Sequence, residues 1–159
     1  MNNELVKRVE DKLLDTLLLA ERLYNRAFEL PKLSFELSSS RIAGQAFLHD
    51  WKIKINSRFL QSNSEEVINV TVPHEVAHLV CFVLHPRAKQ AHGPEWKGIM
   101  QDFGLKPNTY HTMRLPDVRT YTYICSCQKF HLSSLIHKRV QAGQRRRCCK
   151  CKKEIVFLG

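Results

Sequence analysis

Apolar residues recur at helical spacing near the start of the chain. Between residues 6 and 20 they fall three or four positions apart, with charged residues between them. This spacing places the apolar side chains on one face, so the segment is predicted to pack on a core as an amphipathic helix. The positions that define this face are Val6, Val9, Leu13, Leu17 and Ala20.

Alternating apolar and polar residues predict strands after this helix. Residues 32–37 alternate in this way, and residues 51–56 do so more clearly. Residues 43–48 are a third candidate strand, joined to 51–56 by a turn at His49-Asp50. The side chains expected on one face of the last strand are Trp51, Ile53 and Ile55. The edge strand of such a sheet would suit an extended substrate backbone.

A long apolar stretch from Val67 to Leu84 predicts a buried helix. Ser62-Asn63-Ser64-Glu65 fits a capping box at its start, and Pro73 predicts a kink or a new first turn. His85-Pro86 is expected to end this helix. Gly93-Pro94 is then expected to open a shorter helix that runs to about Phe103.

Two histidines lie four residues apart in His74-Glu75-Val76-Ala77-His78, inside the long apolar helix. Residues four apart share a helix face, so both imidazoles can bind one Zn²⁺ at about 2.0–2.1 Å. Glu75 is displaced by about 100° around the helix, which suits a carboxylate that acts on water beside the metal. The pattern predicts a zinc hydrolase site. The alternative is a pair of core histidines with ordinary hydrogen bonds.

His92, just before the next predicted helix, is the candidate for the third ligand. A chain that leaves the zinc helix and re-enters beside it can place an imidazole over the first two. A catalytic zinc site has three protein ligands and one open position, which this arrangement would satisfy. The alternative for His92 is a helix-entry residue without a chemical role. Glu95 either orients a ligand as a hydrogen-bond acceptor or stabilises the N-terminus of the helix.

Five of the six cysteines follow residue 120. Cys125-x-Cys127 and Cys148-x-x-Cys151 form two knuckles about twenty residues apart, a spacing suited to one tetrahedral structural Zn²⁺. Cys149 could replace Cys148, but the two-residue gap before Cys151 favours Cys148. The alternative is a disulfide or redox pair, which a reducing compartment disfavours. Cys81, in the apolar helix, is expected to be a buried and inert thiol.

These motifs resemble those of the SprT-like zinc metalloprotease family, which includes an animal protease that acts on DNA–protein crosslinks. The resemblance rests on residues 74–78, 92–96, 123–127 and 148–151, and it is strongest to the short bacterial members. It implies an α+β fold, with a minimal zincin-like metalloprotease core of helices and a small sheet at residues 1–117. A basic zinc-ribbon module at residues 118–159 would follow this core.

The resemblance also implies zinc-dependent hydrolysis of peptide bonds, with Glu75 catalytic and His74, His78 and His92 as zinc ligands. Cys125, Cys127, Cys148 and Cys151 would then bind the structural zinc of the ribbon. Tyr110 and His111 are candidate donors to the oxyanion of a tetrahedral intermediate, or simply loop residues.

Basic residues concentrate at the C-terminal end. Ten of the 25 Lys and Arg residues follow residue 117, where Glu154 is the single acidic residue, so nearly all of the net charge of +10 lies there. Such a field favours phosphate backbones and predicts salt-dependent, largely sequence-independent binding of nucleic acid. A solvated basic surface or an acidic protein partner is the alternative. The expected contacts are Lys138, Arg139, Arg145, Arg146, Arg147 and Lys150.

Together these features predict a zinc endopeptidase whose ribbon brings it to DNA and DNA-bound protein. The alternatives are a zinc-stabilised nucleic-acid-binding protein without protease activity and a zinc hydrolase of non-peptide amides. Charge soon after Met1 argues against a secretory signal, and residues 13–20 are too short and interrupted to span a bilayer. A cytoplasmic protein without membrane contact is expected, associated with the nucleoid if it binds DNA.

Overall fold

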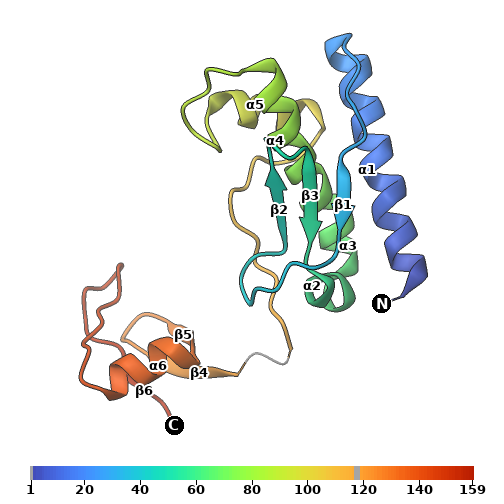
Figure 1. Cartoon of the computed structure of the whole chain (residues 1–159). Helices are drawn as coiled ribbons and strands as arrows, with labels where there is room; N and C mark the ends of the chain where they lie inside the picture. The colour runs from blue at the N-terminus through green and yellow to red at the C-terminus, as the bar shows by residue number, and fades with distance from the viewer. Residues whose placement is uncertain (1, 117–118) are drawn as a thin grey trace. The chain divides into compact units, whose positions relative to one another are not determined.

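The computed structural model describes residues 2–116 and 119–159. The chain divides into two compact units, with the boundary between Leu115 and Pro116 (Figure 1). Each unit combines its own three-stranded sheet with helical structure, so the α+β class expected from the sequence is confirmed. The domain boundary predicted between residues 117 and 118 lies outside the described residues.

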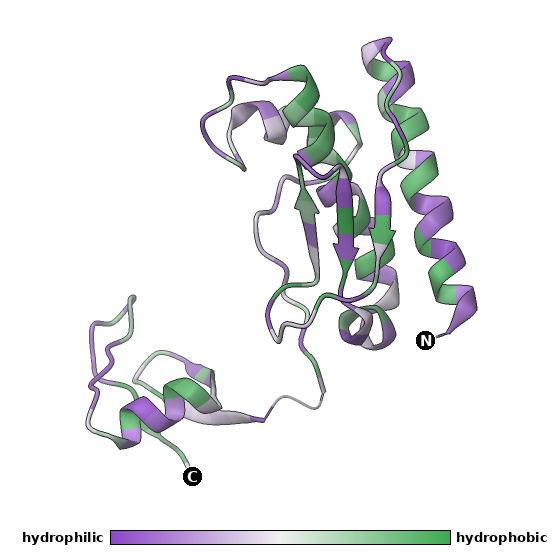
Figure 2. Ribbon diagram, viewed as in Figure 1, coloured by the Kyte–Doolittle hydropathy of each residue, from purple (hydrophilic) through white to green (hydrophobic). Residues whose placement is uncertain are grey.

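The sheet of the first unit contains β1 (Lys32–Ser34), β2 (Gly44–Phe47) and β3 (Lys52–Ile55). β3 is central, parallel to β1 and antiparallel to β2, so β2 forms one edge of the sheet (Figure 1). Hydrophilic and hydrophobic residues alternate along β3 (Figure 2), and both of its isoleucines are fully buried. This alternation fixes which face of the sheet meets the helices, because successive side chains point to opposite faces.

All three predicted strands are longer than the observed ones. The 32–37 segment leaves the sheet after Ser34, and Glu36 forms only an isolated bridge with Asn56. Trp51 does not share the buried face of β3, because it adopts a left-handed φ of 48° in the turn before the strand. Its indole N–H instead donates to the carbonyl oxygen of Glu29 at 2.8 Å.

Helix α1 (Asn3–Tyr24) has the predicted amphipathic character. The Asn2 side chain accepts a hydrogen bond from the N–H of Glu4 and so caps its first turn. The buried face consists of Val9, Leu13, Thr16, Leu17 and Ala20. This face packs on α4 (Val72–Leu84), the core helix, which also contacts β2, β3 and α5 (Pro94–Asp102).

Four helical pieces follow one another from β3 to the end of α4. They are α2 (Ser57–Ser62), α3 (Ser64–Glu66), the π-helical segment η1 (Val67–Thr71) and α4. The predicted capping box is wrong, because Ser62 closes α2. Asn63 precedes α3 without a side-chain cap, and its amide donates instead to the carbonyl oxygen of Arg114 at 3.2 Å.

The π-helical segment explains how a proline is accommodated at the start of α4. Pro73 lacks an N–H, and in a regular α-helix its ring would clash with the carbonyl four residues back. The wider turn relieves this conflict, and the N–H of Val72 bonds to the carbonyl of Val67 five residues back. The first turn predicted at Pro73 is therefore present.

Residues Ser64–Leu84 are long and apolar enough to cross a membrane, judged by length and composition alone. Most of this stretch is buried inside the first unit. Its apolar residues serve the core, including Val76, Leu79 and Val80, none of which is exposed.

The second unit is a small antiparallel sheet with one helix. It contains β4 (Thr120–Ile124), β5 (Lys129–Ser133), α6 (Ser134–Gln141) and β6 (Val156–Phe157), with β4 in the middle. Among the described residues of this unit, the buried core consists of Tyr123, Cys148 and Ile155, with partly buried side chains packed against them. So small a core needs an additional staple, such as a disulfide or a metal, to be stable.

Candidate metal centres

The first candidate centre is the histidine cluster, formed by His74, His78 and His92. α4 presents His74 and His78 one turn apart, and the loop before α5 brings His92 to them. The three Nε2 atoms lie 3.1, 3.1 and 3.2 Å from one another. Two nitrogen ligands of a tetrahedral zinc at 2.0–2.1 Å would be about 3.3 Å apart, so the spacing fits one ion. All three residues are half-buried.

The protonation states of these histidines also suit a metal. Burial first, and the neighbouring imidazoles second, lower the pKa of His74 to about 4 and that of His78 to about 3. Burial, followed by the charge of Lys97, lowers the pKa of His92. A metal-binding imidazole must be neutral, and this environment keeps the rings neutral at pH 7.

Trp96 forms a wall against the histidine cluster. It lies in α5, is fully buried, and its ring is 4.7, 5.3 and 4.6 Å from the rings of His74, His78 and His92. Its indole N–H points to the carbonyl oxygen of His74 at 3.5 Å. Trp96 was assigned no role from the sequence, although its place in the first turn of the helix that follows His92 was a usable signal.

Glu75 is buried between α4 and β2, with 6% of its surface exposed. Burial raises the pKa of its carboxyl group to about 8, and a hydrogen bond from the backbone N–H of Ala46 partly opposes this increase. Among the described residues, the group that could hold an ion here consists of the three histidines, and Glu75 is not part of it. Its carboxylate is therefore left free for another task.

The other candidates near this centre differ in their placement. Tyr110 is 89% exposed, so its hydroxyl group lies in solvent. The Nε2 atom of His111 lies 2.9 Å from the carbonyl oxygen of Arg41, while its Nδ1 atom is buried without a partner among the described residues. The charge of His111 contributes to the lowered pKa of His74. Of the two candidates, His111 is therefore the one whose side chain lies near the histidine cluster.

Glu95 occupies the first turn of α5. Its carboxylate folds back over the helix N-terminus, where a Cβ atom added to Gly93 would come within 2.9 Å of Oε2. This placement fits the helix-stabilising alternative, because a negative charge is favourable at a helix N-terminus.

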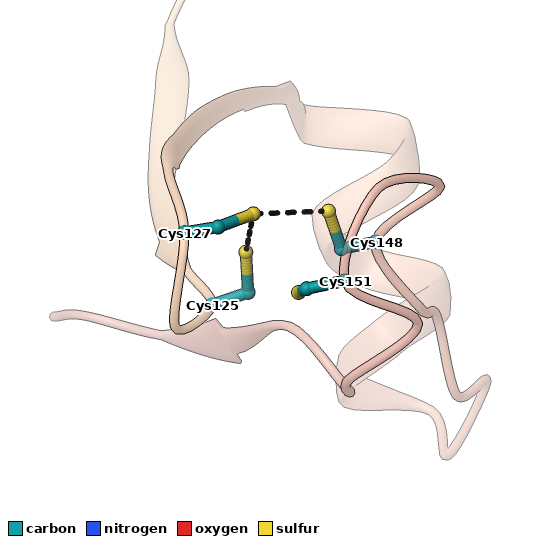
Figure 3. A group of neighbouring side chains, drawn as sticks. All are labelled: Cys125, Cys127, Cys148 and Cys151. Carbon is teal, nitrogen blue, oxygen red and sulfur yellow. Dashed lines mark hydrogen bonds between the residues drawn. The ribbon is translucent and has the colours of Figure 1, made fainter.

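The second candidate centre is the cysteine cluster, formed by Cys125, Cys127, Cys148 and Cys151. Figure 3 shows the four side chains converging from the turn after β4 and from the segment before β6. The Sγ atom of Cys127 lies 3.4 Å from that of Cys125 and 3.6 Å from that of Cys148. Tetrahedral zinc with Zn–S bonds of 2.3 Å requires about 3.8 Å, so the cluster is close to the needed spacing. Cys149 is exposed and outside this group.

Hydrogen bonds favour the thiolate form at two of these cysteines. Bonds from the Ser126 side chain and from the backbone N–H of Lys153 lower the pKa of the Cys151 thiol to about 6. Backbone N–H groups, that of Cys151 first, lower the pKa of Cys148. The thiolate is the form that binds a metal, so these donors suit a metal site.

Comparison with known proteins bears on the first of these centres. The sequence profile of the SprT-like family matches residues 13–114, which contain the whole histidine cluster. The chain belongs to the SprT-like family. Protein SprT of Pseudomonas syringae pv. tomato is 37% identical over 100% of this chain and 97% of its own length. Protein SprT of Pasteurella multocida is 36% identical over 95% of the chain and 93% of its own.

A third relative, Protein SprT of Vibrio parahaemolyticus, is 31% identical over 100% of this chain and 98% of its own length. The comparison with solved structures gave no match. The cysteine cluster of this SprT-like chain lies beyond the profile match, but within the length that it shares with these relatives.

The second unit of this SprT-like chain also carries an open cavity of about 430 Å³. Three of the predicted basic residues line it, namely Arg145, Arg146 and Arg147, together with the apolar side chains of Phe130, Leu132 and Ile155. The Nε atom of Arg146 is buried there without a partner among the described residues. Lys138 and Arg139 belong to the last turn of α6 instead, and Lys150 lies between two members of the cysteine cluster.

Proposed function

We propose that this protein is a zinc-dependent metallopeptidase that acts on DNA-associated proteins. The observation that carries the proposal is the combination of three imidazole nitrogens within 3.2 Å of one another and a buried, unligated carboxyl group on the same helix. A site that only stabilises a fold has no need of such a carboxyl group.

His74, His78 and His92 would hold the catalytic zinc. Zinc bound there would polarise the carbonyl group of a peptide bond and lower the pKa of a water molecule. Three protein ligands are the number that catalytic zinc sites have, so a zinc ion held by these imidazoles would still be able to bind water or substrate.

Glu75 is the proposed general base. Glu75 lies beside His74 on α4 and is not one of the three ligands, so its carboxylate can exchange a proton with water at the centre. A carboxylate oxygen of Glu75 would take a proton from the attacking water and then return it to the leaving amine. Of the two candidate donors, His111 is the better one to stabilise the oxyanion, because the Tyr110 hydroxyl group lies in solvent.

The edge strand β2 would align the substrate. Within the described part of the chain, β3 is the one strand that pairs with β2. β2 also contacts α4, where the backbone N–H of Ala46 donates to the Glu75 carboxylate. An extended peptide that pairs with a free strand edge is bound through its backbone and so with little sequence preference.

The second unit would bind nucleic acid. Support comes from the ten basic residues after residue 117 and from the cavity that three consecutive arginines line beside Phe130. Arginines bind phosphate groups, and an aromatic ring offers a surface on which a base can stack. Zinc-bound thiolates need a reducing compartment, so we infer that the protein works in the cytoplasm next to DNA.

Glu75→Gln tests the catalytic assignment. With a DNA-bound protein as substrate, we expect zinc content equal to that of the wild type and loss of cleavage. Glu10→Gln is the matched control, since Glu10 is an exposed residue of α1, and it should cleave normally. Undiminished cleavage by Glu75→Gln would remove the base assignment.

The alternative is a zinc-stabilised nucleic-acid-binding protein without protease activity. The cavity in the second unit favours this function independently of the histidine cluster. Wild-type protein that holds two zinc ions and binds DNA, yet leaves every bound protein and itself intact, would establish the alternative.

A further inference from the structure

Gly44 lies where the edge strand β2 meets the core helix. A Cβ atom added to Gly44 would come within 2.6 Å of Cγ2 of Thr71, 2.9 Å of Cγ of Glu75 and 3.0 Å of Oε1 of Glu75. Real Cβ contacts are essentially never shorter than 3.0 Å, so any side chain here must displace one of these two residues.

The backbone conformation does not explain a glycine at this position. The glycines with positive φ are Gly104, Gly143 and Gly159, whereas Gly44 lies in an ordinary strand. Glycine weakens a strand, because it costs conformational entropy and offers no side chain to pack. The observation that accounts for Gly44 is therefore the close approach of Thr71 and Glu75.

Ala46 completes the contact two residues along the same strand. Residues two apart point to the same face of a strand, so Gly44 and Ala46 both face α4. The backbone N–H of Ala46 donates a hydrogen bond to the Glu75 carboxylate. The strand thus positions Glu75 in two ways: Ala46 donates a hydrogen bond to its carboxylate, and Gly44 leaves room for its side chain.

We propose that Gly44 is a positioning residue for Glu75. Its missing side chain lets the carboxylate stay on the N–H of Ala46, and a methyl group at Gly44 would push the carboxylate off that donor. This inference rests on the proposed function, in which Glu75 moves the proton. It adds that β2 contributes to catalysis in two ways, through the backbone N–H of Ala46 and through the absence of a side chain at Gly44.

The test separates the Glu75 contact from simple packing. Gly44→Ala meets both Thr71 and Glu75, whereas in Gly44→Ala/Thr71→Ser the closest atom, Cγ2, is gone and the contact with Glu75 remains. We expect the double variant to regain the melting temperature of Thr71→Ser and to bind zinc fully. Its kcat should stay at least about ten-fold low with KM little changed, because small displacements of a catalytic group are costly.

Gly98→Ala is the matched control. Gly98 lies in α5, and a Cβ atom added there meets nothing within 4 Å. This variant should keep full activity and gain stability, since alanine is favoured over glycine in a helix. A double variant that recovers wild-type kcat when its stability recovers would overturn the inference and leave Gly44 a packing residue.

A second readout does not depend on activity. In the metal-free protein, the ¹³C carboxyl resonance of Glu75, assigned by its loss in Glu75→Gln, should shift in Gly44→Ala/Thr71→Ser and not in Gly98→Ala. An unchanged resonance would overturn the inference. A shifted resonance in a protein whose wild type cleaves nothing would support the contact while the proposed function fails.

Discussion

The indole ring of Trp96 lies against the imidazole of His78, with ring centroids 5.3 Å apart and planes 23° from parallel. The same indole meets the other two members of the histidine cluster at their edges. One buried side chain from α5 therefore limits the rotation of all three proposed zinc ligands.

Trp96→Phe should weaken zinc binding at the histidine cluster by about ten-fold, as is usual when residues that orient metal ligands are changed. Phenylalanine retains a buried ring but loses the N–H that points to His74 and part of the wall. Competition with a chromogenic chelator measures the affinity. Trp51→Phe, at the turn before β3, is the control and should leave zinc affinity unchanged. Equal affinities for all three proteins would show that the wall has no effect on the ligands.

Cys148→Ser should remove one zinc ion per chain and unfold the second unit, because the small core around Tyr123 cannot hold it alone. Cys149→Ser changes a neighbouring exposed thiol and should retain both ions and the fold. Metal analysis and far-ultraviolet circular dichroism report the two properties. If Cys149→Ser lost zinc and Cys148→Ser retained it, the ligand would be Cys149 and not Cys148.

The hydroxyl group of Tyr24 donates a hydrogen bond of 2.7 Å to Oδ2 of Asp102, which joins the end of α1 to the end of α5. Tyr24→Phe should lower the free energy of unfolding by about 1 kcal/mol at pH 7. Burial, followed by the bond to Asp102, raises the pKa of Tyr24 above its usual value of 10.0.

The raised pKa fixes the sign of the pH dependence. Above pH 10 the unfolded chain loses the Tyr24 proton while the folded chain keeps it, so the wild type loses stability as pH rises. The difference between wild type and Tyr24→Phe should therefore shrink above pH 10 in urea titrations. Tyr110→Phe, which changes a side chain that is 89% exposed, is the control and should show no such trend.

Replacing Arg145, Arg146 and Arg147 by glutamine should weaken DNA binding and reduce the slope of log K against log salt by up to about three, one for each phosphate contact. Fluorescence anisotropy with a labelled oligonucleotide at several salt concentrations gives this slope. The control replaces three exposed basic residues of the first unit with glutamine, namely Lys7, Arg26 and Lys106. The same loss in both triple variants would mean that net charge alone decides binding.

The two metal centres could be predicted because their signals are local. His74 and His78 are one helical turn apart, and the cysteines form two short knuckles, so spacing alone brings each pair together. His92 followed from the helix break between the two helices. These predictions needed no knowledge of the sheet.

The contacts around Glu75 could not be predicted in the same way. Gly44 and Ala46 lie about thirty residues before Glu75, and their role depends on how β2 packs against α4. The failed capping box has a similar cause, because Asn63 bonds to Arg114, fifty-one residues away, rather than to its own helix. Tertiary contacts determine both the surroundings of Glu75 and the hydrogen bonds of Asn63. Local sequence patterns carry no information about such contacts.

The π-helical turn at Val67–Thr71 sets the direction in which the zinc-binding residues face. With one residue fewer before Pro73, the segment would close as a regular α turn, and the rest of the core helix would rotate by about 100° relative to α3. His74 and His78 would then turn away from the loop that carries His92. Relatives that share this centre should accordingly tolerate substitutions in these five positions far better than a deletion among them.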